Sequence, residues 1–140
     1  MTMQQSNSLI KSAADIHENK VKMDKYWNNY VQILLKKITL SERTYHHQIV
    51  ACHSNKLVIS VFNYLQLEVI RLSAFGPVNI EYRTLIQDTH PVIAQTSFID
   101  SCGLLDGSIP HNDQEQVFQH YLNKLQPLYD YLNELSYKGK

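Results

Sequence analysis

Two short groups of metal-ligating residue types lie in the first half of the chain, His46-His47 and Cys52-His53. Neutral imidazole and thiolate are good ligands for zinc or nickel, so these side chains could form a metal centre. If residues 44–53 form one strand, however, successive side chains alternate between its faces, and His46 lies about 20 Å from Cys52 at ~3.3 Å per residue. We therefore expect imidazoles that pack or face water, and we predict no metal site.

Other catalytic chemistry lacks a recognisable arrangement of residues. A thiol nucleophile at Cys52 or Cys102 would need an adjacent histidine and a third orienting group, and proximity in sequence says little about such an arrangement. The four glycines are isolated from one another, which argues against a glycine-rich phosphate loop. Asp106-Gly107 could belong to a catalytic carboxylate loop, but we favour a hairpin turn, which needs residues that tolerate positive φ. We predict a protein that is not an enzyme and carries no cofactor.

Composition describes a single domain without a net charge. The 140 residues include 13 basic and 13 acidic side chains, and 44% of the residues are hydrophobic, which is enough for a packed core. Because no positive field attracts phosphates, direct DNA binding is disfavoured, and the cluster Lys36-Lys37 with Arg43 is too small to change this. The chain has only two cysteines, which predicts a reducing, cytoplasmic location, and it has no apolar run long enough to predict a membrane segment.

An amphipathic ladder occupies the N-terminal third of the chain. Its apolar members recur at steps of three and four around a gap at Lys20: Leu9, Ala13, Ile16, Met23, Trp27, Tyr30, Leu34 and Ile38. This spacing predicts one long helix. The ladder is close to a heptad repeat, so the helix either lies across a sheet, which we favour, or forms a coiled-coil seam with a second copy of the chain, which would make a homodimer.

The middle of the chain changes to a period of two and is rich in β-branched and aromatic residues, which predicts a sheet. The expected strands cover residues 44–52, 56–62, 65–72, 78–86 and 92–99, with a further short strand at 104–105 or 108–109. Turns are expected at residues 54–55, 63–64, 75–77 and 87–91. These connections are too short for crossover helices, so the strands should form an antiparallel meander.

A second amphipathic pattern ends the chain. Asn112 or Asp113 offers a helix N-cap, and apolar residues follow at helical spacing from Val117 to Leu135. Pro127 predicts a kink or a break near residues 123–126. The predicted fold is one α+β domain spanning residues 1–140, with a long N-terminal helix, a five- to six-stranded antiparallel meander and a C-terminal helix on one sheet face. Residues 1–8 and 136–140 are expected to be flexible.

Short strings in a fixed order carry a resemblance to a known family. They are Ile38-Thr39-Leu40-Ser41, His46-His47, Ile80-Glu81-Tyr82, Ile93-Ala94-Gln95 and Leu105-Asp106-Gly107. The last helix carries the densest set, namely Asp113, Glu115-Gln116-Val117, His120-Tyr121-Leu122, Lys124 and Tyr129-Asp130. In order and separation they resemble the formate hydrogenlyase regulatory protein family (HycA), over residues 24–135.

The resemblance implies a negative regulator of transcription in the cytoplasm. Such a protein opposes a formate-responsive activator and thereby lowers expression of the formate hydrogenlyase and hydrogenase-maturation operons. We expect it to act by protein–protein contact with that activator. One alternative is an adaptor or chaperone that binds a formate hydrogenlyase subunit or maturation factor. Another is a ligand-sensing domain or small enzyme, which would need a deep pocket with convergent polar groups.

The outer faces of the two helices are the candidate contact surface for a protein partner. The polar residues that we assign to it are His120, Lys124, Asp130 and Glu134 in the last helix, and Lys22, Lys25 and Asn29 in the first. Such side chains could dock the activator or block its self-association. For each position the alternative is a solvated side chain without a partner protein.

Overall fold

The computed structural model describes residues 3–85 and 93–138, and it confirms the predicted α+β order of elements. The helices are α1 (Met3–Leu40), the short α2 (Glu42–Tyr45) and α3 (Gln114–Lys138). The strands are β1 (His47–His53), β2 (Lys56–Val61), β3 (Leu65–Arg71), β4 (Val78–Leu85), β5 (Ile93–Ile99), β6 (Leu104–Leu105) and β7 (Ile109–Pro110). Residue 86, the turn predicted at 87–91 and residue 92 lie outside the described residues.

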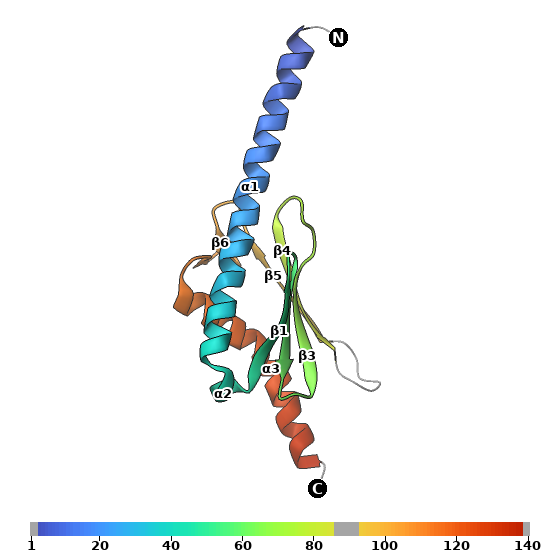
Figure 1. Cartoon of the computed structure of the whole chain (residues 1–140), viewed down its shortest axis with the longest axis vertical. Helices are drawn as coiled ribbons and strands as arrows, with labels where there is room; N and C mark the ends of the chain where they lie inside the picture. Colours follow the sequence, from blue (N-terminus) through green and yellow to red (C-terminus); the bar gives the residue numbers. More distant parts are fainter. Residues whose placement is uncertain (1–2, 86–92, 139–140) are drawn as a thin grey trace.

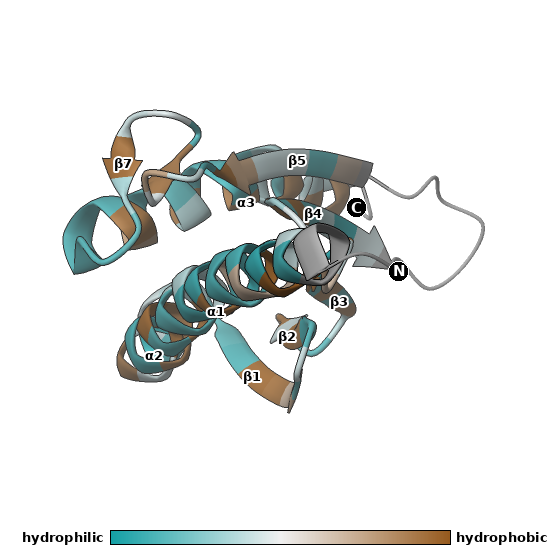
Figure 2. Ribbon diagram, turned by 90° about the horizontal axis from the view of Figure 1, so that it is seen from above, coloured by the Kyte–Doolittle hydropathy of each residue, from teal (hydrophilic) through white to brown (hydrophobic). Residues whose placement is uncertain are grey.

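The strands form one antiparallel sheet in sequence order, as the short connections require. It has seven strands instead of five to six, because the segments near residues 104 and 109 both pair, as β6 and β7. The sheet curls around α1, which runs along its concave side (Figure 2). α3 packs against the same core, since Val117 and Tyr121 are as fully buried as Tyr30 of α1 and Ile80 of β4.

The first strand is shorter than predicted and contains an irregularity. It begins at His47 instead of residue 44, because residues 42–45 form α2 and His46 has a left-handed backbone with φ of 56°. A bulge between Ile49 and Ala51 then shifts the register. An extra residue reverses the alternation of side chains. His47 and Cys52 therefore share a face of the sheet, so the predicted alternation was wrong.

α1 has two halves with different environments. From Met23 to Ile38 the apolar ladder is buried in the core, which confirms that this part of the helix packs within the chain. Residues 7–19 are all exposed, and this half projects beyond the body of the molecule along its long axis (Figure 1). We call residues 7–22 the arm. The two helices place the chain ends at opposite ends of the molecule (Figure 1).

α3 begins as predicted and continues past its proline. The Asp113 carboxylate accepts a hydrogen bond from the backbone N–H of Gln116 at 3.1 Å, which makes Asp113 the N-cap. Of the kink or break predicted near residues 123–126, the break is wrong, because the helix is uninterrupted through Pro127. Proline weakens hydrogen bonding to carbonyls one turn earlier, and Gln95 Nε2 donates to the Lys124 carbonyl there at 2.7 Å. The Gln95 side chain of β5 therefore supplies a hydrogen-bond donor to a backbone carbonyl of α3 near the proline.

The two ends of the chain are helical as far as the structure describes them. α1 starts at Met3 and α3 continues to Lys138, within the segments 1–8 and 136–140 where the sequence predicts flexibility. Residues 1–2 and 139–140 lie outside the described residues. Among the described helices, none is long and apolar enough to cross a membrane.

Candidate functional site

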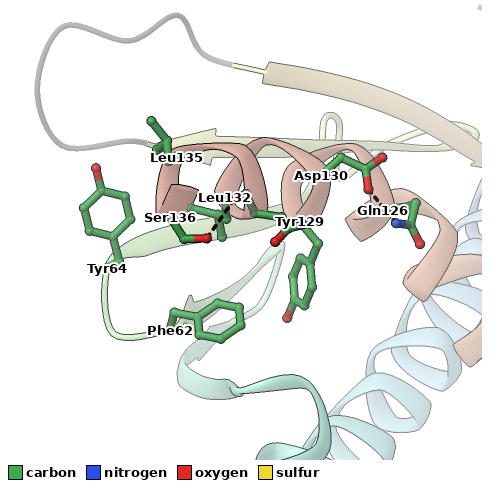
Figure 3. Close-up of a pocket in the computed structure, with 9 residues that line it drawn as sticks. Phe62, Tyr64, Gln126, Tyr129, Asp130, Leu132, Leu135 and Ser136 are labelled. Atoms are coloured by element: carbon green, nitrogen blue, oxygen red, sulfur yellow. Dashed lines mark hydrogen bonds between the residues drawn. The ribbon is translucent and has the colours of Figure 1, made fainter. Parts of the chain in front are cut away.

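An open groove between the β2–β3 turn and the C-terminal half of α3 is the main candidate site. It has a volume of about 750 Å³. We call it the aromatic groove, and it is lined by Phe62, Tyr64, Gln126, Tyr129, Asp130, Leu132, Asn133, Leu135 and Ser136. The rings of Phe62 and Tyr129 lie at one end of it, and Tyr64 and Leu135 lie at the other (Figure 3). An exposed, mostly apolar groove of this kind suits a protein segment.

Phe62 occupies a backbone conformation that a bulky residue rarely adopts. Both Phe62 and Asn63 have left-handed φ values, 54° and 51°, in the turn between β2 and β3. A left-handed conformation costs an ordinary residue roughly 1–2 kcal/mol. Ring contacts offset part of this cost, because Phe62 stacks on His46 at 5.1 Å and lies 5.6 Å from Tyr129. Phe62 nevertheless remains 48% exposed, so it also presents apolar surface to a partner.

The wall formed by α3 is held in place by a long-range hydrogen bond. The Tyr129 hydroxyl donates to the Tyr45 carbonyl at 2.6 Å, and this bond fixes α3 against α2. Burial raises the pKa of the Tyr129 hydroxyl to about 12, so it is protonated and able to donate near neutral pH. At the rim, the Asp130 carboxylate is exposed and accepts a hydrogen bond from Gln126 at 2.8 Å. The groove therefore combines a fixed apolar wall with an acidic edge.

The residues that we assigned to the contact surface do not all lie on outer faces. Asp130 lines the groove and Glu134 is exposed on the same helix. Lys124 is partly buried, because its ammonium donates to the Thr96 carbonyl at 3.0 Å. The placement of His120 on an outer face is wrong: it is 9% exposed and points toward β5.

The three α1 residues of that surface lie in the middle of the helix, away from the aromatic groove. Lys25 is exposed and Lys22 is partly exposed. Asn29 is half-buried, and its amide nitrogen lies 3.3 Å from Nε2 of His111, which follows β7. The residues of α1 and α3 that the sequence analysis assigned to one contact surface therefore do not lie on a single surface.

A partly buried polar cluster beneath α3 contains the residue types of a catalytic triad. Asp106 Oδ2 accepts hydrogen bonds from the Ser97 hydroxyl at 2.9 Å and from His120 Nε2 at 2.7 Å, and Ser97 Oγ lies 3.2 Å from the same nitrogen. In a triad the serine and the carboxylate bind opposite ring nitrogens. Here both lie at Nε2, while Nδ1 is buried without a hydrogen-bond partner among the described residues. The cluster fastens α3 to the sheet and is not arranged for nucleophilic catalysis.

Electrostatics in this cluster favour a neutral histidine beside a charged carboxylate. Burial lowers the pKa of His120, although the Asp106 carboxylate opposes that effect. Protonation would also place an N–H at Nδ1, where no acceptor lies among the described residues. Burial acts to raise the pKa of Asp106, but hydrogen bonds from His120 and Ser97 outweigh it and leave the pKa lowered. Asp106 does form the predicted turn, with φ of 52°.

His47 is a structural residue at the start of β1. Its side chain is buried, with Nε2 2.8 Å from Ser41 Oγ and Nδ1 3.1 Å from the Tyr121 hydroxyl. Ser41 donates its own proton to the Lys37 carbonyl at 2.7 Å, so Ser41 Oγ accepts from His47 Nε2–H. Burial lowers the pKa of His47 to about 4. In the described part of the chain, no group of three or more His, Cys, Asp or Glu side chains could hold a metal ion.

Sequence reasoning missed the aromatic groove because its walls come from distant segments. It placed Phe62 at the end of a strand and the turn at residues 63–64. One signal was available: a Phe-Asn-Tyr run falls where a hairpin turn favours small or polar residues, so aromatic side chains there have another role. The contribution of α3 to the groove could not be read from that signal.

Comparisons with known proteins now identify the family. A family model described as "Transcriptional repressor of hyc and hyp operons" matches residues 3–137. The formate hydrogenlyase regulatory proteins HycA of Escherichia coli K12, Escherichia coli O157:H7 and Shigella flexneri are each 32% identical over 127 residues, covering 88% of this chain and 82% of the relative. No solved structure matches the chain. The chain thus belongs to the HycA family of transcriptional repressors of the hyc and hyp operons.

Proposed function

We propose that this protein lowers transcription of the formate hydrogenlyase and hydrogenase-maturation operons by binding a formate-responsive activator protein. It acts in the cytoplasm, by protein contact and without catalysis. Family membership supports the regulatory role. The balance of 13 basic and 13 acidic residues supports a protein target over DNA, because phosphate neutralisation supplies most of the affinity for nucleic acid.

The aromatic groove is the single observation that carries the contact mechanism. It is open and largely apolar, and its exposed aromatic side chains are of the type enriched at the centres of protein interfaces. Asp130 adds one negative charge at the rim. The occupant that fits is a helix or extended segment of the activator with an apolar face and a basic residue at its edge. Docking there would hold the activator away from its own assembly or from the promoter.

Binding measurements with purified proteins test this proposal. The affinity of the chain is measured for the activator and, in parallel, for promoter DNA at the same physiological salt concentration. We expect saturable binding to the activator and none to DNA. Binding to DNA alone would contradict the contact mechanism. Binding to neither would favour the adaptor alternative, for which a formate hydrogenlyase subunit or maturation factor should copurify.

Two variants test whether the activator binds in the aromatic groove. Tyr64→Ala removes an exposed ring, and Asp130→Lys reverses the charge at the rim, and neither residue belongs to the buried core. Each should weaken activator binding at least tenfold, which corresponds to about 1.4 kcal/mol. Asp15→Lys is the matched control, because it makes the same charge change at an exposed position of the arm. If the groove variants bind as tightly as this control, the activator docks elsewhere.

A further inference from the structure

The arm carries apolar side chains that the described part of the chain leaves largely exposed. Leu9 is 64% exposed, Ile10 is 66% exposed and Ile16 is 51% exposed, although each is a large hydrophobic residue. Scattered apolar side chains on a surface need no explanation. Leu9 and Ile16, however, lie with Ala13 along one side of a helix, at the spacing of the ladder that builds the core, and Ile10 flanks them. They therefore form a continuous apolar stripe.

The stripe continues the apolar face of α1 that packs in the core farther along the helix. From Met23 onward the same heptad positions are occupied by Trp27, Tyr30 and Leu34, which pack within the core. The arm projects past the curled sheet (Figure 1), and Leu9, Ala13 and Ile16 are exposed on it. Most of the stability of helices in proteins comes from packing of an apolar face. The arm has the pattern of a buried helix and lacks its partner in a single copy.

The charge pattern of the arm identifies the kind of partner. At 100° per residue its outward side chains lie opposite the stripe, and they are Lys11, Asp15, Glu18 and Lys22. The positions that flank the stripe, which face a partner helix in a coiled coil, carry no fixed charge; they are Ile10, Ser12, His17 and Asn19. Two such arms meet without repulsion. The mixture of acids and lysines on the outer face does not suit an anionic membrane surface.

We propose that two copies of the chain pair through their arms as an antiparallel two-helix coiled coil. The antiparallel direction follows from the position of the sheet. From Met23 onward each sheet covers the face of α1 that would continue a parallel seam, so two bodies at the same end would collide. In the antiparallel arrangement the bodies lie at opposite ends of the paired arms. Ile16 of each copy then packs on Ala13 of the other, and Leu9 packs on the aliphatic stem of Lys20.

The geometry of Lys20 fits this register. Its ammonium is already held by Asp24 at 3.0 Å and by the Ala74 carbonyl at 3.0 Å, both of which belong to the same chain. The charged end is therefore directed toward the body of its own chain and away from the arm. The hydrocarbon stem is left to contact the Leu9 side chain of the second copy. The dimer goes beyond the proposed function and does not depend on the aromatic groove.

The oligomeric state of the full chain tests the pairing. Sedimentation equilibrium should give a mass near twice 16.3 kDa that falls on dilution. Ile16→Asp places a charge in the seam and should raise the dimer dissociation constant at least tenfold. Asp15→Lys, on the outward face, should leave it unchanged. A monomer at every concentration, or a dimer that survives Ile16→Asp, would overturn the proposal. Because both positions are exposed in the single copy, neither variant should alter the melting of the body.

Cysteine cross-linking tests the direction of the arms. Both native cysteines are exposed and free, so Cys52→Ser with Cys102→Ser gives a cysteine-free background. In that background, Leu9→Cys chains are mixed with Lys20→Cys chains and oxidised. Antiparallel arms should yield mixed disulfide dimers and few dimers of either chain with itself. A parallel seam would give the reverse, joining each chain to its own kind, and would overturn the proposed direction.

Discussion

The hydroxyl groups of Tyr30 and Tyr82 meet at 2.6 Å inside the core and join α1 to β4. Burial raises the pKa of both hydroxyls, so each stays protonated and one donates to the other. Replacing only Tyr82 with Phe leaves the Tyr30 hydroxyl without this partner in a buried site. We expect Tyr82→Phe to lower the free energy of unfolding by about 1–3 kcal/mol.

A double-mutant cycle separates this hydrogen bond from packing. The variant with both Tyr30→Phe and Tyr82→Phe should lose less stability than the sum of the single variants, because no unpaired hydroxyl of this pair remains. Denaturant unfolding of the four proteins supplies the values. Additive losses would show that the two hydroxyls do not act as a pair.

Trp27 anchors the buried half of α1. It is 1% exposed, and its indole N–H donates to the Ser54 carbonyl at 2.8 Å. Trp27→Ala should lower the free energy of unfolding by about 3–5 kcal/mol through the cavity that it leaves. Lys11→Ala is the control on the outward face of the exposed half of the same helix and should change the stability of the body by less than ~0.5 kcal/mol. Equal melting temperatures for the two variants would contradict the division of α1.

The buried and exposed halves of α1 also show how far the sequence could predict the fold. Periodicity located both helices and the meander, because burial of one helix face and short connections leave few arrangements. It could not show where the ladder of α1 leaves the core, since Leu9 and Trp27 occupy equivalent positions in the repeat. The bulge after Ile49 was missed for a related reason: one extra residue in a strand changes no local pattern.

The candidate site was less predictable than the fold because it depends on tertiary placement. His120 was assigned to an outer face because a histidine at a helical position fits a solvated face as well as a buried one. Its burial follows from Asp106 and Ser97, which lie in other elements. The aromatic groove likewise joins Phe62 to Tyr129, and only the path of α3 brings these residues together.

His47 should make the fold sensitive to acid. Burial lowers its pKa from 6.5 to about 4, so the folded state stays neutral in a range where the unfolded state takes up a proton. Its contribution to stability is fully present above pH 6.5 and is lost as the pH falls toward 4. At 1.36 kcal/mol per pKa unit the loss is on the order of 3 kcal/mol.

Replacement of His47 tests this assignment. His47→Phe removes the titrating group, so the free energy of unfolding, measured between pH 7 and pH 4, should fall less steeply than in the unmodified protein. His120, whose pKa is also lowered, contributes a slope of the same sign, so some pH dependence should remain. An unchanged slope in His47→Phe would exclude His47 as a source of acid sensitivity.

Gly103 is required in the turn before β6 for two separate reasons. Its φ is +79°, and an added Cβ would lie 2.8 Å from His111 Nδ1 and 3.1 Å from a ring carbon of Tyr26. Gly76 also has positive φ, +91°, but no atom would lie within 4 Å of its added Cβ. Both alanine variants should carry backbone strain of roughly 1–2 kcal/mol, and Gly103→Ala should lose more because of the clash. Similar unfolding free energies would show that the clash relaxes without cost.

Phe62→Asn separates the strain of the β2–β3 turn from the use of the aromatic groove. Asparagine tolerates the left-handed backbone, so the variant recovers part of the roughly 1–2 kcal/mol that this conformation costs. It also loses the ring contacts with His46 and Tyr129. Because the two effects oppose each other, the net change in unfolding free energy should stay within about 1 kcal/mol, whereas activator binding should weaken at least tenfold. A variant that binds the activator as tightly as the unmodified protein would show that Phe62 does not contribute to binding in the groove.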